Sequence, residues 1–329
     1  MNAFFFVCHL ALALITLLPM NARGQAHRSV VFYVVAHPDD WQLFMGEAAY
    51  DDLADPTRKV VFIYLTAGDA GQGDHVQCYD YPKAHPYYLA REEGALASVR
   101  LVADRLQNKS CPGVYTTTTA EFRVTTYLAG RLPQTRTHRL HRVAYLNSVS
   151  YFMRLPDAPN PYTHTGDYLT DFRNDGRRAR HPLTMAPVDS GTLYHSWSDV
   201  TKTVRAILVR ESAGLPDYTV NLPDPDPALN PQDHCQHIAA GLAVLADLPA
   251  SAARLVQWVG YDIDHRPDNL PPLAIVKKTA LYAAYNTAKV MAGAASDWDL
   301  ITTTEGDHRR LVRSYSRQTA RISIPSRRP

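Results

Sequence analysis

The stretch from Val30 to Phe44, VVFYVVAHPDDWQLF, decides the fold of this chain. Its first seven residues are rich in valine and aromatic side chains, as expected of a strand buried on both faces. His37-Pro38-Asp39-Asp40 follows, and a proline with two aspartates is typical of a turn and a helix start. We therefore expect a buried strand from Val30 to Ala36 and a helix that begins near Asp40. Ligands of open α/β sheets bind beyond the carboxyl ends of the strands, so one imidazole and two carboxylates are expected in that crevice.

Strand and helix patterns alternate along the rest of the chain. A second buried strand, KVVFIYLTAGDAG from Lys59 to Gly71, runs into a glycine-rich loop. Further elements are expected at Tyr87–Leu106 (helix), Ser198–Ser212 (helix), Tyr218–Leu222 (strand), from Asp233 (helix, with Asp233 as its N-cap), in ARLVQWVGYDI (strand) and up to Gly293 (final helix). This alternation predicts an α/β, Rossmann-like, doubly wound and mostly parallel sheet with helices on both faces.

The middle third of the chain is less regular. The segments Val114–Ala129 and Arg139–Val149 carry threonine, tyrosine and valine at a density typical of strands. Residues 154 to 192 are rich in proline, aspartate, glycine and arginine and follow neither a helical nor a strand period. A loop of that length in a compact domain usually covers a site or is mobile. We expect an irregular insertion on the substrate side of the fold.

The first 26 residues have the composition of a signal peptide. An apolar run from Ala3 to Leu18 is followed by the small residues Gly24 and Ala26, as at a cleavage site. An uncleaved anchor helix is the alternative. We therefore expect a signal peptide at 1–26, a single domain at 27–313, a basic flexible tail at 314–329, and a secreted or periplasmic protein.

Composition and charge limit the partners. The 329 residues are 46% hydrophobic, enough for a substantial core, and the formal net charge of +2 indicates neither nucleic acid nor an acidic membrane as partner. We expect a small-molecule or glycan substrate and no stable membrane partner after signal cleavage. In an oxidising compartment, Cys78 and Cys111, in loops flanking one helix, are expected to pair and Cys235 to stay free.

Two clusters of metal-ligating side chains stand out. His37, Asp39 and Asp40 follow the first strand, and His234 and His237 lie at the start of a later helix. The spacing of three places His234 and His237 on one helix face. Two histidines and one carboxylate with open positions form the ligand set of a catalytic divalent metal, most often zinc. Either cluster alone is also consistent with a helix cap or a solvated histidine pair. Together they indicate a site.

These residues carry a family resemblance. Ala-His-Pro-Asp-Asp after a buried strand resembles the signature of the PIG-L/LmbE-like deacetylases, zinc-dependent enzymes that remove acetyl groups from N-acetylglucosamine-containing substrates. His234-Cys235-Gln236-His237, with Gly241 after it, resembles that family's second histidine motif. Further similar elements are LTAGDAG at 65–71, Arg91-Glu92-Glu93, and the final helix with Lys278 and Tyr285-Asn286.

The resemblance implies a zinc-dependent N-deacetylase or amidohydrolase acting on linear amides. It implies His37, Asp40 and His237 as ligands of Zn²⁺, or of another divalent metal such as Fe²⁺. It implies Asp39 as general base and His234 as the residue that steadies the oxyanion or protonates the leaving amine. Such chemistry agrees with general principles, because a bound cation acidifies water, a nearby carboxylate takes the proton, and an imidazolium opposite supplies charge. The alternatives are an amidase for another sugar conjugate and a non-catalytic carbohydrate-binding protein of the same fold.

Two positions depart from the family pattern. Trp41 stands where an acidic residue is common, and it either offers a sugar-stacking face or belongs to the core. Gln236 stands where aspartate is frequent, which removes a carboxylate that could orient His237, and Asp233 either replaces it or merely caps the helix. Arg91 and Asp69 are further candidate substrate-binding residues, with a salt bridge and a structural turn as their respective alternatives.

Overall fold

The computed structural model describes residues 27–72, 84–106, 113–127, 132–157, 169–174, 184–215, 218–249, 253–298 and 307–319. The expected signal peptide and the expected Cys78–Cys111 pair lie outside these ranges. Cys235 is exposed and forms no disulfide with another described residue. Within the described ranges, we found no helix with the length and apolar character needed to span a membrane.

Strands and helices alternate as the sequence pattern predicts. The strands are β1 (Ser29–Val35), β2 (Arg58–Thr66), β3 (Thr116–Thr126), β4 (Gln134–Tyr145), β5 (Ser148–Leu155), β6 (Tyr218–Pro223), β7 (Ala253–Trp258) and β8 (Ser316–Thr319). The helices are α1 (Asp40–Phe44), α2 (Gly46–Leu53), α3 (Tyr87–Ala103), α4 (Leu169–Asn174), α5 (Trp197–Ser212), α6 (Cys235–Ala246), α7 (Pro272–Met291) and α8 (Asp307–Arg310), with 3₁₀ turns η1 (Asp104–Leu106) and η2 (Tyr261–His265).

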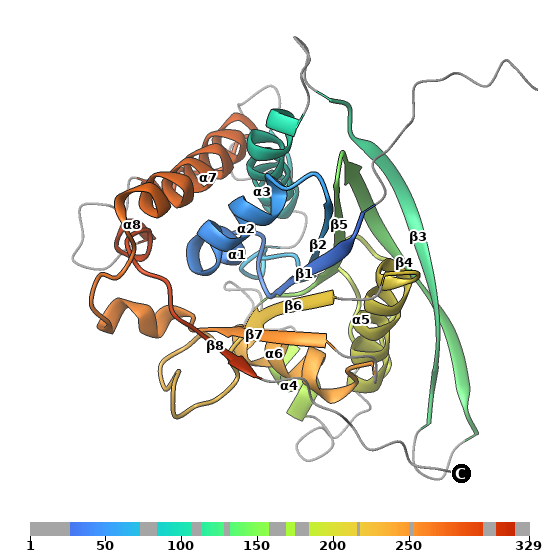
Figure 1. Ribbon diagram of the computed structural model, residues 1–329. Coiled ribbons are helices and arrows are strands. Elements are labelled where there is room, and N and C mark those ends of the chain that lie inside the picture. Colours follow the sequence, from blue (N-terminus) through green and yellow to red (C-terminus); the bar gives the residue numbers. More distant parts are fainter. Residues whose placement is uncertain are drawn as a thin grey trace, which may run out of the picture.

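The strands form one sheet in the order β3-β4-β5-β2-β1-β6-β7-β8. Its five central strands, from β5 to β7, run parallel, while β3, β4 and β8 pair antiparallel at the two edges. Helices cover both faces of this sheet (Figure 1). The predicted α/β, doubly wound and mostly parallel architecture is therefore confirmed.

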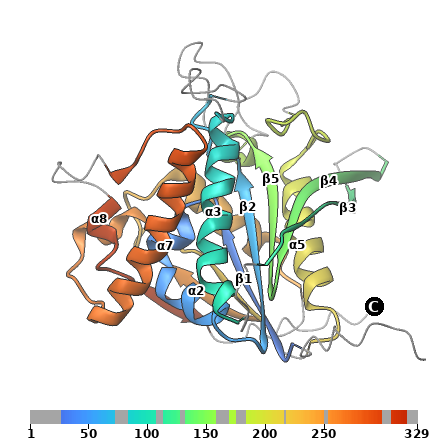
Figure 2. The same cartoon turned by 90° about the horizontal axis from the view of Figure 1, so that it is seen from above.

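The residues of β1 alternate between two cores. Val30, Phe32 and Val34 pack on one face of the sheet with apolar residues of α4, α5 and α6. Val31, Tyr33 and Val35 pack on the other face with residues of α1, α2, α3 and α7. Figure 2 shows α3 and α7 side by side on one side of the strands and α5 on the other. A strand covered on both faces has no polar side, which explains the unbroken apolar run in the sequence.

Two element boundaries differ from the prediction. The first helix is interrupted at Met45, whose φ of −126° and ψ of 10° are not helical, so α1 and α2 are separate. The strand expected at Arg139–Val149 instead spans the end of β4, a turn and the start of β5. That turn contains neither glycine nor proline. Leu146 adopts a positive φ of 52°, and Asn147 Nδ2 lies 3.1–3.2 Å from the carbonyl oxygens of Leu53, Asp55 and Arg58.

The flexible tail was expected to start at residue 314, which is too early. Ser316 to Thr319 form β8, which pairs antiparallel with β7. Ser314 Oγ donates to the carbonyl oxygen of Phe44 at 3.0 Å, and Lys278 Nζ donates to that of Arg310 at 2.7 Å. The segment up to Thr319 therefore belongs to the domain and contacts the end of α1. Residues 320 to 329 lie outside the described ranges.

A cavity of about 420 Å³ lies along β1, β6, β7 and β8, beside α2. Its lining includes Tyr33, Asp52, Asn221 and Arg254. None of the five residues of the two predicted clusters lines it, so the cavity is separate from the predicted site.

Candidate metal centre

The two predicted clusters meet at one edge of the sheet. β1 and β6 are parallel neighbours, and His37 to Asp40 follow β1 while His234 and His237 follow β6. From β1 the chain continues to β2 on one side, whereas β6 lies on its other side. Such a change of direction opens a crevice at the carboxyl ends of the strands. The sequence distance of about 200 residues between the clusters is closed by this topology.

Three donor atoms form a small triangle at this edge of the sheet. His37 Nδ1 lies 3.2 Å from His237 Nε2 and 3.2 Å from Asp40 Oδ1, and His237 Nε2 lies 3.1 Å from Asp40 Oδ1. All three side chains are buried. Ligands bonded to tetrahedral zinc at about 2.0–2.1 Å are themselves about 3.3 Å apart. The three atoms thus already have almost the separations that a bound metal requires.

Each ligand-type histidine has a carboxylate at its other ring nitrogen. His37 Nε2 lies 2.7 Å from Asp157 Oδ1, and His237 Nδ1 lies 2.8 Å from Asp233 Oδ1. Because a carboxylate only accepts hydrogen bonds, these outer nitrogens carry the protons. When these rings are neutral, as a bound metal requires, their lone pairs point into the triangle, which is the arrangement that metal-binding histidines usually show.

Asp157 was not anticipated from the sequence. It follows the end of β5 by two residues, in the segment for which no structure was predicted. Its backbone N–H donates to Asp69 Oδ1 at 3.0 Å, and Gln236 Nε2 donates to its carbonyl oxygen. An acidic residue just past a strand end was the signal that identified Asp39 and Asp40. That signal was missed here because the strand was expected to end at Val149.

The carboxylates favour the charged form of both histidines when no metal is bound. Burial alone would lower the pKa of His37, but Asp157 and Asp40 raise it well above its usual value. Burial likewise opposes the charge of His237, whose pKa Asp40 and Asp233 nevertheless raise to about 9. The facing imidazoliums hold the pKa of Asp40 well below its usual range despite its burial. A metal ion would take the place of these protons, since it binds neutral histidine and ionised carboxylate.

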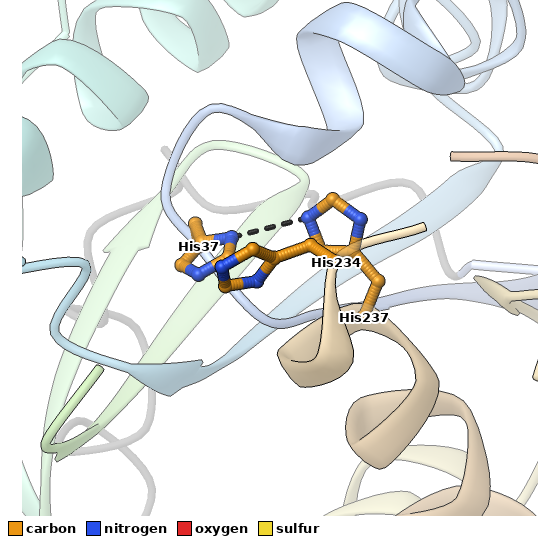
Figure 3. Close-up of side chains that lie close together, drawn as sticks. All are labelled: His37, His234 and His237. Atoms are coloured by element: carbon orange, nitrogen blue, oxygen red, sulfur yellow. Dashed lines mark hydrogen bonds between the residues drawn. The ribbon is translucent and has the colours of Figure 1, made fainter. Parts of the chain in front are cut away.

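His234 lies beside the triangle. One nitrogen of each of His37, His234 and His237 lies within 4.8 Å of the others, and the three rings converge (Figure 3). His234 Nδ1 is buried and has no hydrogen-bond partner among the described residues. Burial, together with the nearby His37 and His237, lowers the pKa of His234 to about 4. His234 is therefore neutral near pH 7, whereas an imidazolium was expected at this place.

Asp39, the neighbour of Asp40 in the sequence, forms an ion pair with Arg91. Arg91 Nη2 pairs with Asp39 Oδ1, Nη1 donates to the carbonyl oxygen of Gly68 at 2.7 Å, and Nε donates to Tyr285 Oη at 2.9 Å. The salt bridge that was the alternative for Arg91 is thus present. Asp39 retains more exposure than its neighbour, with 14% of its side chain accessible against 3% for Asp40.

Two predicted substrate contacts have structural roles instead. Trp41 is fully buried, its ring centroid lies 4.7 Å from that of Phe62, and its Nε1 donates to Tyr64 Oη at 3.0 Å. The indole belongs to the core and offers no face to a substrate, which corrects that assignment. Asp69 is also buried, and its carboxylate accepts from the backbone of Asp157. This contact corresponds to the structural alternative for Asp69.

Asp233 is not the N-cap that was expected, because His234 occupies that position. Its carboxylate instead accepts from His237 Nδ1 at 2.8 Å and from the backbone N–H groups of His234 and Tyr261 at 2.8 and 3.0 Å. Asp233 thus fixes His237, while Gln236 reaches Asp157 on the side of His37. The loss of an aspartate at position 236 leaves both ligand-type histidines supported.

Comparisons with known proteins add little to this geometry. No protein-family model matches the sequence, and no curated protein matches it. Among solved structures, the chain is similar to N,N'-diacetylchitobiose deacetylase from Pyrococcus horikoshii in complex with its inhibitor MPG. The two share 15% identity with a TM-score of 0.40, over 89% of this chain and 84% of that one. Similarity at this level assigns neither an activity nor a substrate to the present chain. Fold and site define it as a doubly wound α/β protein with a candidate mononuclear metal centre.

Proposed function

We propose that this protein is a metal-dependent hydrolase that removes the N-acetyl group from an N-acetylglucosamine-type amino sugar or conjugate. The observation that carries the proposal is the triangle of His37 Nδ1, Asp40 Oδ1 and His237 Nε2, with edges of 3.1–3.2 Å. A helix cap or a solvated histidine pair would not place three buried donor atoms together with a carboxylate behind each histidine.

The residues present fit a divalent metal. The donor set of two imidazoles and one carboxylate suits zinc and also ferrous iron. His234 offers one more nitrogen within 4.8 Å of those of His37 and His237, and its buried Nδ1 has no hydrogen-bond partner among the described residues. Such a metal supplies a water of lowered pKa and polarises the amide carbonyl. His37, Asp40 and His237 hold it, while Asp157 and Asp233 keep the two imidazoles in the required orientation.

The remaining polar residues supply the proton transfers. Asp39 takes the proton of the attacking water, because it is the more exposed of the two adjacent carboxylates while Asp40 belongs to the triangle. The neutral His234 donates an N–H to the oxygen of the tetrahedral intermediate. The C–N bond then breaks, acetate leaves, and the amine receives the proton that the water lost.

The substrate class rests on the sequence resemblance. Ala36 to Asp40 and His234 to His237 carry the motifs of the PIG-L/LmbE-like deacetylases, which act on N-acetylglucosamine-containing molecules. The apolar segment at residues 3–18 adds that the enzyme is exported, so that its substrate is a sugar conjugate outside the cytoplasm.

Metal content and acetate release test this function together. We expect the purified mature chain to contain about one divalent metal per chain by elemental analysis. It should release acetate from at least one member of a panel of N-acetylated sugars, oligosaccharides and glycolipids. Asp39→Ala should keep the metal but lose about 10³-fold or more in acetate release. Asp51→Ala, at an exposed position, is the matched control and should retain both.

Two results would reject the proposal. A chain without metal that gains no activity from added zinc points to the carbohydrate-binding alternative. Normal turnover by Asp39→Ala removes the role of Asp39 as base, whatever the metal content.

A further inference from the structure

We propose that Arg91, seated by Gly68 and Tyr285, is a positioning residue that fixes the direction of Asp39, and that it is not the substrate contact which the sequence suggested. The inference rests on the proposed function, since Asp39 is the base of that reaction. It assigns roles to Gly68 and Tyr285, neither of which the reaction itself uses.

Every nitrogen of the Arg91 guanidinium donates to the protein. Nη2 pairs with Asp39, Nη1 donates to the Gly68 carbonyl oxygen at 2.7 Å, and Nε donates to Tyr285 Oη at 2.9 Å. These partners come from the loop after β1, the loop after β2 and helix α7. The planar, rigid fork of a guanidinium suits a role in which three segments are held in one geometry. Three of its five N–H groups are thereby committed to the protein.

Two glycines make room for this arrangement. A Cβ at Gly68 would lie 2.6 Å from Arg91 Nη1 and 2.8 Å from Pro38 Cδ, and the φ of Gly68 is +59°. A Cβ at Gly94, one turn after Arg91 on α3, would lie 2.6 Å from Tyr285 Cδ2. α3 and α7 therefore approach closely enough for the Tyr285 hydroxyl to reach Arg91. The sequence has small residues at the two places where the contact needs them.

The environment keeps the Arg91 charge in place. Arg91 is buried, and burial would lower its pKa, yet Asp39 and the hydroxyls of Tyr285 and Tyr87 raise that pKa well above its usual value. Tyr87 also lies under the guanidinium, with its ring centroid 5.8 Å from Cζ. Removing one partner of a buried ion pair leaves the other charge uncompensated. Asp39 without Arg91 would therefore turn toward solvent or toward the metal ligands.

Steady-state kinetics separate positioning from substrate binding. On the best acetylated sugar of the panel, metal-loaded Arg91→Lys should lose about 10–100-fold in kcat with KM changed less than about threefold. A low, non-denaturing concentration of guanidinium should raise the kcat of Arg91→Ala at least tenfold. Tyr285→Phe should lose about 3–10-fold in kcat. Tyr282→Phe, which removes a hydroxyl from the ring stacked on Tyr285, is its control and should stay within about twofold.

A thermal double-mutant cycle tests the clamp, that is, the ion pair by which Arg91 holds Asp39, without any substrate. Asp39→Asn and Arg91→Gln are combined, and the Tm loss of the double variant should be smaller than the sum of the single losses by about 2 °C or more. The control cycle replaces Arg91→Gln by Arg154→Gln, because Arg154 pairs with Glu92 at 2.7 Å instead of Asp39. That cycle should be additive.

The outcomes distinguish the two hypotheses. A KM raised tenfold or more at unchanged kcat in Arg91→Lys overturns the positioning role and makes Arg91 a substrate contact. An additive Asp39–Arg91 cycle overturns the clamp itself. A wild-type chain that releases no acetate from any panel member rejects the proposed function, while the thermal cycle still decides whether the clamp exists.

Discussion

His37 and His237 do the same task with different support. His237 receives its carboxylate from Asp233, four residues earlier in the same segment. His37 receives its carboxylate from Asp157, 120 residues away, which Asp69 and Gln236 hold in place. The first support is local and forms with the start of α6. The second exists only when the ends of β1, β2 and β5 and the start of α6 are assembled, so half of this centre depends on the tertiary fold.

Removing either histidine is the largest test of this comparison. His37→Ala and His237→Ala each delete one of three ligand atoms, so both should weaken metal binding by at least about 10³-fold and reduce acetate release to background. The measurement is competition with a chromogenic chelator, followed by elemental analysis. Equal metal content in either variant and in the wild type would remove that histidine from the ligand set.

Titration of the metal-free protein compares the two supports directly. The folded pKa values of His37 and His237 are raised, to about 9 for His237, above about 6.5 in the unfolded chain. Their stabilisation is therefore complete below about pH 6.5 and is lost as the pH rises through the folded values. His234 acts in the opposite sense: its pKa of about 4 makes stability fall as the pH drops from about 6.5 to 4.

The contributions of these three histidines should thus give the chelator-treated protein its highest Tm near pH 6.5. This Tm should fall by several degrees as the pH rises to 9. NMR titration of the histidine Hε1 signals identifies the groups. A His237 signal that titrates near pH 6.5 would contradict the assignment, and metal-loaded protein, in which both rings are neutral, is the control.

Asp157→Asn and Asp233→Asn compare the supporting carboxylates. Loss of such a carboxylate typically costs 10–100-fold in metal affinity, and we expect this range for both variants. They should differ in stability. Asp233 also accepts from two backbone N–H groups, so Asp233→Asn should lower Tm more than Asp157→Asn. The reverse order of Tm values would mean that the distant support carries more of the fold than the local one.

Gln236→Ala gives the smallest expected effect. It removes the donor to the Asp157 carbonyl oxygen and leaves Asp233 untouched, so metal affinity should fall by only about threefold. The Hε1 signal of His37 should shift while that of His237 stays in place. A shift of the His237 signal alone would show that Gln236 supports His237 and not, through Asp157, His37.

The fold could be predicted from the sequence wherever local chemistry sets it. The apolar runs of β1 and β2 and the helices α5 and α7 are visible residue by residue. The β4–β5 boundary was not, because Leu146 and Asn147 form a turn whose stability comes from carbonyl groups of the segment around Leu53 to Arg58. β8 likewise forms a strand because it pairs with β7, and its short polar sequence gives no sign of that pairing.

The site divides in the same way. His37, Asp39, Asp40, His234 and His237 were predicted; the structure brings His37, Asp40, His234 and His237 together and pairs Asp39 with Arg91. Asp157 was missed because nothing near it in sequence indicates a partner 120 residues away. The neutral state of His234 was also not foreseen, since it follows from burial beside two other imidazoles. Charge states of buried groups depend on neighbours that only the fold supplies.

The hydrogen bond from Ser314 to Phe44 determines how much of the chain must be synthesised before the first helix can complete its contacts. The two residues are 270 positions apart, and Phe44 ends the helix that begins with Asp40. A ribosome delivers the amino-terminal residues first. Almost the whole chain must therefore be synthesised before α1 can form its hydrogen bond with Ser314. A nascent chain that stops before Ser314 carries every metal-ligating residue and still lacks the contact that closes the helix bearing one of them.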